Sequence, residues 1–166
     1  MEKIVALFTA VLLLALTASA QSAKVAPKDL KVLEGSQWIG SLTYLDYSSH
    51  KPTTIKSNVT ITRSTGDGLT WVFDMQYPEE PKANSRDEVK LSRDGRTLDG
   101  EMVVERTKLQ GGVLRIVTTK PGKDDERPAT LRHTYLISKR TFSIKKEVKI
   151  DGDAAFFERN TYSWMR

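Results

Sequence analysis

One histidine stands where a side chain could do chemistry inside the fold. His133 lies with Leu131, Tyr135 and Ile137 on the apolar side of a segment in which apolar and polar residues alternate. An imidazole in an apolar cavity can bind a metal or haem iron, or act as a general base. It can also be a core histidine that is hydrogen-bonded to a neighbour such as Tyr135 or to a backbone carbonyl. The sequence favours this structural role over the chemical one.

Several kinds of active site are excluded by residue types that the chain lacks. It has no cysteine and only two histidines, His50 and His133, so it has no disulfide framework, thiolate metal site or cysteine nucleophile. No spacing of carboxylates completes a zinc site, and no Gly-x-Ser-x-Gly motif is present. The acidic groups at 124–126 and 151–153 are typical of turns and have too few ligands for a calcium loop. We therefore predict no catalytic residue, no metal site and a binding protein rather than an enzyme.

Aromatic residues also recur on the apolar side of a second segment. Trp71, Phe73 and Tyr77 alternate with polar or smaller residues, as the inward side chains of a strand do. They either fill the interior of the fold or line a pocket, and the sequence leaves both open. The predicted ligand-lining residues are Trp71, Phe73, His133 and Tyr135.

The elements that would position these residues are strands. Segments of alternating apolar and polar residues are separated by turn-forming pairs such as Gly111-Gly112, Pro121-Gly122 and Asp151-Gly152. Such short strands with tight connections are typical of an antiparallel meander. The predicted strands are 37–47, 53–64, 69–77, 85–92, 98–109, 113–120, 129–138, 141–150 and 156–165.

A meander with one apolar face per strand can form a sandwich or a closed barrel. The short sequential connections favour a barrel, because a sandwich usually needs long crossovers between its sheets. Leu30 and Leu33 at helical spacing, followed by Gly35, predict one short helix before the first strand. We predict an all-β, antiparallel up-and-down barrel of about nine strands over 29–166, preceded by a flexible leader over 21–28.

The first twenty residues predict export. A charged start, an apolar run over 4–16 and a small-residue exit at 18–20 are typical of a secretory signal peptide cut after Ala20. The expected location is therefore secreted or periplasmic, without a cysteine for lipid attachment and without a second apolar stretch long enough to span a membrane. The net charge of +5 comes from interleaved acidic and basic residues, which does not favour nucleic-acid binding.

Two segments carry a resemblance to a known superfamily. Segment 30–40 is a short helix, a glycine and then Trp38 at the start of a strand, and segment 156–164 places Arg159 in the last strand. This pattern resembles the lipocalin-like, or calycin, superfamily. The resemblance implies that Trp38 seals the barrel floor and that Arg159 packs across it, as a cation–π pair would. Barrels similar to nitrobindin hold haem through a single histidine. By this resemblance, His133 would be the residue that binds haem.

Three functions remain open. The leading hypothesis is a secreted or periplasmic barrel that binds a small hydrophobic or amphipathic molecule in its cavity. The second is a haem-binding barrel that uses His133 as the axial ligand, and otherwise no cofactor is expected. The third is an envelope interaction module with a filled core. We expect a monomer or a weak dimer, and the sequence identifies no protein partner.

Overall fold

The computed structural model describes residues 23–35, 37–49 and 51–166. The predicted signal peptide and His50 lie outside the described residues. In the part of the chain that is described, no helix is both long enough and apolar enough to cross a bilayer.

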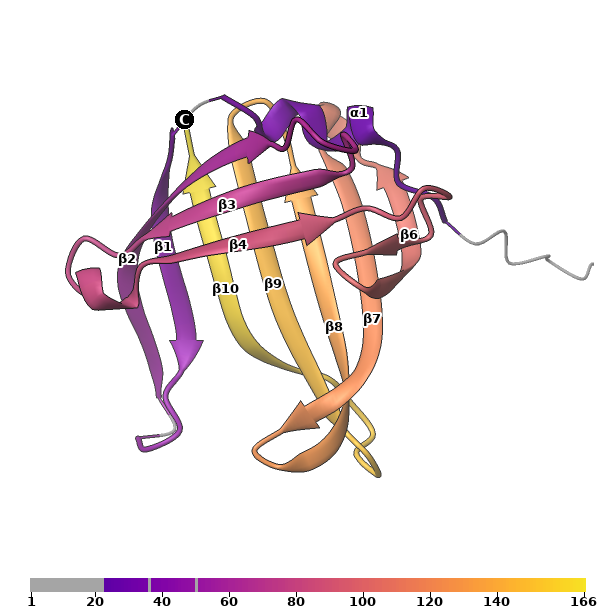
Figure 1. Cartoon of the computed structure of the whole chain (residues 1–166). Helices are drawn as coiled ribbons and strands as arrows, with labels where there is room; N and C mark the ends of the chain where they lie inside the picture. The colour runs from indigo at the N-terminus through magenta and orange to yellow at the C-terminus, as the bar shows by residue number, and fades with distance from the viewer. Residues whose placement is uncertain (1–22, 36, 50) are drawn as a thin grey trace, which may run out of the picture.

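The described residues form one short α-helix and ten strands joined into a single antiparallel sheet (Figure 1). Short 3-10 turns lie at Lys31–Leu33, Pro81–Ala83 and Gln110–Gly112. The elements are α1 (Pro27–Leu30), β1 (Gln37–Leu45), β2 (Pro52–Arg63), β3 (Thr70–Gln76), β4 (Ser85–Lys90), β5 (Thr97–Leu98), β6 (Glu101–Lys108), β7 (Leu114–Asp124), β8 (Arg127–Ile137), β9 (Thr141–Ile150) and β10 (Phe157–Met165).

The sheet closes almost completely into an up-and-down barrel, which confirms the predicted fold class. Each strand pairs with its sequence neighbours, except that β4 does not pair with β5, and β1 also pairs with β10. The order is therefore β4-β3-β2-β1-β10-β9-β8-β7-β6-β5. β4 and β5 therefore stand at the two ends of this order. They meet only near a single bridge, from Leu91 to Leu98, among the residues described.

The structure has ten strands rather than about nine because a turn divides one predicted strand. Asp99 and Gly100 both adopt positive φ, 53° and 73°, which is the backbone of a two-residue type I′ hairpin turn. This turn separates β5 from β6 within the segment 98–109. An Asp-Gly pair is a strong signal for such a turn. The prediction missed it because apolar residues continue at alternating positions on both sides of the pair.

A second turn lies four residues further along than predicted. Pro121 and Gly122 are inside β7, where they pair with Thr130 and Ala129 of β8. The hairpin turn is instead at Asp125 and Glu126, whose φ values are 49° and 59°. Pro121 is tolerated in the strand because β6 pairs with β7 only as far as Thr119, so the missing N–H of the proline breaks no ladder bond on that side.

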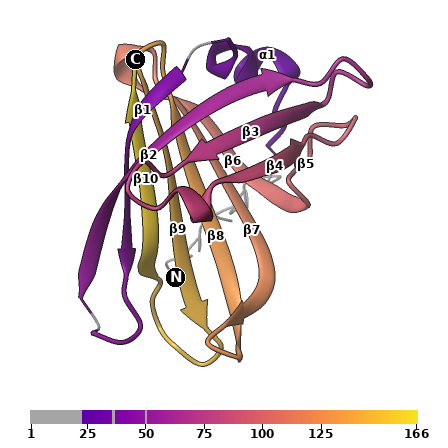
Figure 2. The same ribbon diagram turned by 60° about the vertical axis from the view of Figure 1, so that its left-hand side comes forward.

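One end of the barrel is closed by the N-terminal segment (Figures 1 and 2). Leu30 and Leu33 are buried against the core, and a partly buried ion pair joins Asp29 to Arg106 of β6 at 2.6 Å. The C-terminus lies at the same end (Figure 1). The structure also ties down part of the expected flexible leader, because Val25 is 3 % exposed and its N–H donates to the carbonyl of Gly95 at 2.9 Å.

Candidate functional site

The barrel interior holds a cavity of about 260 Å³ beyond its packed, closed end. Its walls are mainly aromatic and apolar, with a few polar groups. This inner cavity is lined by Phe73, Met75, Tyr77, Ser85, Asp87, Val89, Asp99, His133, Tyr135, Ile144, Asn160, Tyr162 and Trp164.

A second cavity of about 670 Å³ lies between the inner cavity and the end of the barrel opposite α1. Tyr77 and Asn160 line both cavities, so the two are neighbours along one lumen. The walls of this mouth cavity include Leu42, Tyr44 and Ile55. Its charged lining residues are of both signs: Asp46, Glu80, Lys146 and Arg159. An apolar lumen with a few polar groups is the usual form of a small-molecule site.

The closed end is packed by stacked aromatic rings. The indole of Trp164 lies between the rings of Phe142 and Tyr162, with centroid distances of 5.1 and 5.0 Å. Phe142 also meets the edge of Trp38 at 6.0 Å. Trp38 is fully buried, and its Nε1 donates to the carbonyl of Leu33 at 3.0 Å, which fastens the N-terminal segment over this end.

The prediction that Arg159 packs across Trp38 is wrong. The guanidinium above the Trp38 ring belongs to Arg166, 4.3 Å from the ring centroid. Arg159 lies near the mouth, 3.4 Å above the ring of Tyr47, and donates to the carbonyl of Leu45. The reason is strand direction: β10 runs from the mouth to the closed end, so its first half cannot reach Trp38 at the start of β1.

A β-bulge explains why Arg159 enters the lumen at all. The pairing of β10 with β9 shifts between Glu158 and Asn160, so two successive residues, Arg159 and Asn160, line the mouth cavity. Arg159 is held by Asp124 at 3.4 Å and by the hydroxyl of Tyr47 at 2.9 Å. Alternation alone would have placed one of the two residues outside.

Three of the four predicted lining residues surround the inner cavity. Phe73, His133 and Tyr135 contribute to its walls. Trp71 does not belong to the described lining of either cavity. It is buried at the closed end, where its Nε1 donates to Glu34 at 2.9 Å and Arg63 lies 5.3 Å from its ring.

His133 is held by a buried carboxylate that the sequence analysis missed. Its Nδ1 lies 2.8 Å from Oε2 of Glu101, which is 2 % exposed. Glu101 also accepts a hydrogen bond from Thr118 and pairs with Lys120 at 3.0 Å. Burial opposes ionisation of Glu101, but the hydrogen bonds from His133, Thr118 and Lys120 outweigh it and hold its pKa below the usual value.

This network leaves one histidine nitrogen for the cavity. Because Nδ1 faces Glu101, Nε2 is the ring nitrogen that remains to meet a ligand. Glu101 could have been found from the sequence, since it shares the inward side of its strand with Val103, and a carboxylate on an apolar face requires a partner.

Two phenols of the inner cavity are paired with each other, and the indole of Trp164 has an unpaired N–H. The hydroxyls of Tyr77 and Tyr162 lie 2.8 Å apart. Burial raises the pKa of Tyr162, with a further contribution from the hydrogen bond to Tyr77, so the Tyr162 hydroxyl remains protonated at neutral pH. Trp164 is 3 % exposed, and its Nε1 has no hydrogen-bond partner among the described residues. This nitrogen is itself fully buried, so it belongs to the packed closed end rather than to the surface of the cavity.

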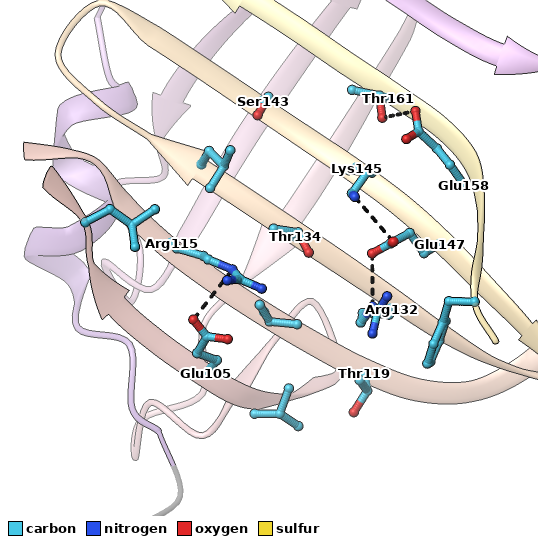
Figure 3. A pocket seen from close by; sticks show the side chains of 15 residues that line it. Glu105, Arg115, Thr119, Arg132, Thr134, Ser143, Lys145, Glu147, Glu158 and Thr161 are labelled. Carbon is cyan, nitrogen blue, oxygen red and sulfur yellow. Dashed lines mark hydrogen bonds and ion pairs between the residues drawn. The ribbon is translucent and has the colours of Figure 1, made fainter. Parts of the chain in front are cut away.

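The outer face of β6–β10 carries a larger hollow of about 850 Å³, shown in Figure 3. Its charged side chains other than Glu158 are paired with one another. Arg132 and Lys145 both contact Glu147, at 3.0 and 3.3 Å, and Arg115 lies 3.5 Å from Glu105 (Figure 3). A surface whose charges largely neutralise each other has few unpaired groups to bind a ligand. We therefore place the candidate site inside the barrel.

Known proteins add no assignment to this geometry. No protein-family model matches the chain, and a search of curated proteins finds none that matches it. Within the described ranges, no three His, Asp or Glu side chains are grouped so that they could hold a metal ion.

Proposed function

We propose that this protein is an exported, lipocalin-like barrel that binds one small amphipathic molecule in its lumen. The observation that carries the proposal is the inner cavity, whose walls combine stacked aromatic rings with a small number of fixed polar groups. Export rests on the N-terminal sequence pattern, and the lipocalin-like relationship rests on the helix–Trp38 pattern together with the barrel topology.

The walls indicate how a ligand would be held. Its apolar body would replace water against Phe73, Ile144 and Tyr162, and each buried CH₂ group contributes about 0.8 kcal/mol to such binding. The hydroxyls of Tyr77 and Tyr162 would fix its orientation. A ligand too long for the inner cavity would extend past Asn160 into the mouth cavity.

A neutral fluorescent probe, N-phenyl-1-naphthylamine, tests lumen binding directly. We expect one probe per protein, with the fluorescence increase that accompanies transfer from water into an apolar site. Asn160→Trp would place an indole where the two cavities meet and would abolish binding. Thr161→Trp is the matched control, because Thr161 lines the outer hollow and the same side chain there leaves the lumen open.

The two variants decide between the lumen and the outer surface. Equal binding by wild type and Asn160→Trp, with loss in Thr161→Trp, would contradict a lumen site. No saturable binding by the wild type would favour the third hypothesis, a filled barrel that works through its surface. Circular dichroism of each variant establishes that the barrel is still folded.

Haem is the second candidate ligand, and the Glu101–His133 contact favours it. A carboxylate at Nδ1 orients the imidazole and strengthens Nε2 as a metal ligand. This candidate requires a Soret band on haem titration that is lost in His133→Ala and kept in His50→Ala. An identical spectrum with His133→Ala would exclude His133 as the axial ligand.

A further inference from the structure

The inner cavity reaches the surface through the side of the barrel. β4 and β5 are held together by the Leu91–Leu98 bridge and by a hydrogen bond from the N–H of Asp99 to the carbonyl of Lys90 at 2.7 Å. Further along β4, no strand pairs with its free edge among the described residues. Asp87 of β4 and Asp99 of the β5–β6 turn are both exposed and both line the inner cavity, so they flank this opening.

The opening is negatively charged in a protein whose net charge is +5. Among the described lining residues of the inner cavity, two are aspartates and none is lysine or arginine. Asp87 accepts a hydrogen bond from Ser85 at 2.7 Å, and neither aspartate forms an ion pair with a described residue. The carboxylate behind them, Glu101, is by contrast already matched by Lys120 at 3.0 Å.

The walls beside these aspartates also suit a cation. Tyr135 and Tyr162 line the same cavity, and the faces of aromatic rings attract positively charged groups. The Trp164 indole, which also lines the cavity, is stacked against Phe142 and Tyr162 and belongs to the packing of the closed end.

We propose that the opening between β4 and β5 is the entrance to the lumen and that it selects ligands carrying a protonated amine. This inference rests on the proposed lumen binding and names the class of ligand. The ammonium group lies between Asp87 and Asp99, and the apolar body of the ligand enters the aromatic cavity behind them. An anionic ligand of the same shape is repelled at this entrance.

A series of three compounds with one alkyl chain tests the inference. Octylammonium, octanol and octanoate are compared by their ability to displace N-phenyl-1-naphthylamine at pH 7 and low salt. We expect octylammonium to bind about three- to tenfold more tightly than octanol, the size of effect given by two partly exposed charge pairs, and octanoate to bind most weakly. The preference decreases as salt is added, because exposed charges are screened.

The double variant Asp87→Asn, Asp99→Asn removes both charges with little change in shape. Asparagine tolerates the positive φ of Asp99, so the β5–β6 turn is kept. We expect octylammonium and octanol to bind this variant equally, with octanol unaffected. Glu88→Gln is the matched control, because Glu88 lies on the same strand, outside the cavity lining, and pairs with Lys90.

The outcomes separate the two proposals. If the probe binds in the lumen but wild type prefers octanol, or the aspartate variant keeps the preference for octylammonium, the entrance inference is overturned and lumen binding stands. If the probe does not bind, or binds regardless of Asn160→Trp, lumen binding fails and the inference fails with it.

Discussion

The Nδ1 atom of His133 on β8 lies 2.8 Å from the Oε2 atom of Glu101 on β6. The two strands are not neighbours, because β7 lies between them and contributes Thr118 to the same carboxylate. The contact therefore joins three strands beside the inner cavity. It fixes the histidine ring and buries a charge that is stable only while its partners remain in place.

The ionisation of Glu101 makes stability depend on pH. Its pKa in the folded protein lies below the ordinary value of 4.5, since His133, Thr118 and Lys120 outweigh the effect of burial. The unfolded chain therefore takes up a proton at this group before the folded protein does. The stabilisation is complete above pH 4.5 and is lost as the pH falls through the folded pKa.

Glu101→Gln removes this contribution. We expect the variant to be less stable than wild type by about 1–3 kcal/mol at pH 7, the cost of losing hydrogen bonds to a charged group. The difference decreases as the pH is lowered below 4.5, because wild type then loses the same interaction. Urea denaturation at pH 7 and at pH 3 measures the difference in stability and its decrease at low pH, with Glu88→Gln as an exposed control. A difference that is equal at the two pH values would contradict this account.

The last residue of the chain closes the barrel. The guanidinium of Arg166 lies above Trp38, and it donates to the carbonyls of Val32 and Lys139 at 2.8 and 3.0 Å. We expect Arg166→Ala to lower the free energy of unfolding by about 1–2 kcal/mol, through the lost cation–π and hydrogen-bond contacts. Arg140→Ala is the control, since Arg140 is exposed in the adjacent turn. Equal stability of the two variants in urea would show that Arg166 does not fasten this end.

Gly40 marks a close approach between β1 and β10. A Cβ atom at this position would lie 1.9 Å from the backbone carbonyl oxygen of Ser163, which cannot rotate away as a side chain can. We expect Gly40→Ala to destabilise the protein by at least about 1–3 kcal/mol, because the first and last strands must separate to accept the methyl group. Thermal unfolding followed by circular dichroism measures the change.

Gly66→Ala is the matched control for this substitution. Gly66 lies in the loop after β2, and the nearest atom to its added Cβ is the Ser64 hydroxyl at 3.8 Å. We expect little change in melting temperature there. If Gly40→Ala had the same melting temperature as Gly66→Ala, the contact between β1 and β10 would be looser than this close approach implies.

The sequence predicts the barrel well because alternation is repeated in nearly every strand. The predicted strand 141–150 has the bounds of β9, and the direction in which Phe73, His133 and Tyr135 point follows directly from the alternation. The turn at Asp99-Gly100 was missed because apolar residues continue on both sides of it.

The parts of the site that could not be predicted depend on contacts between distant strands. Glu101 reaches His133 across an intervening strand, and Arg159 turns inward at a bulge that has no clear sequence signal. Arg166, and not the predicted Arg159, lies above Trp38 for a similar reason. Only the register of β10 against β1 decides which arginine reaches the closed end. Alternation predicts on which side of the sheet a residue lies. The residues that it contacts depend on the strand register, which alternation does not determine.

Native mass spectrometry of the protein, gently purified from its own host, tests the central claim most directly. The account predicts a reproducible additional mass of one small molecule per chain, absent from Asn160→Trp and present in Thr161→Trp. The entrance between Asp87 and Asp99 predicts that this molecule carries an amine. A protein that has the mass of its chain alone, and that gains none when octylammonium, octanol or haem is added, would contradict lumen binding.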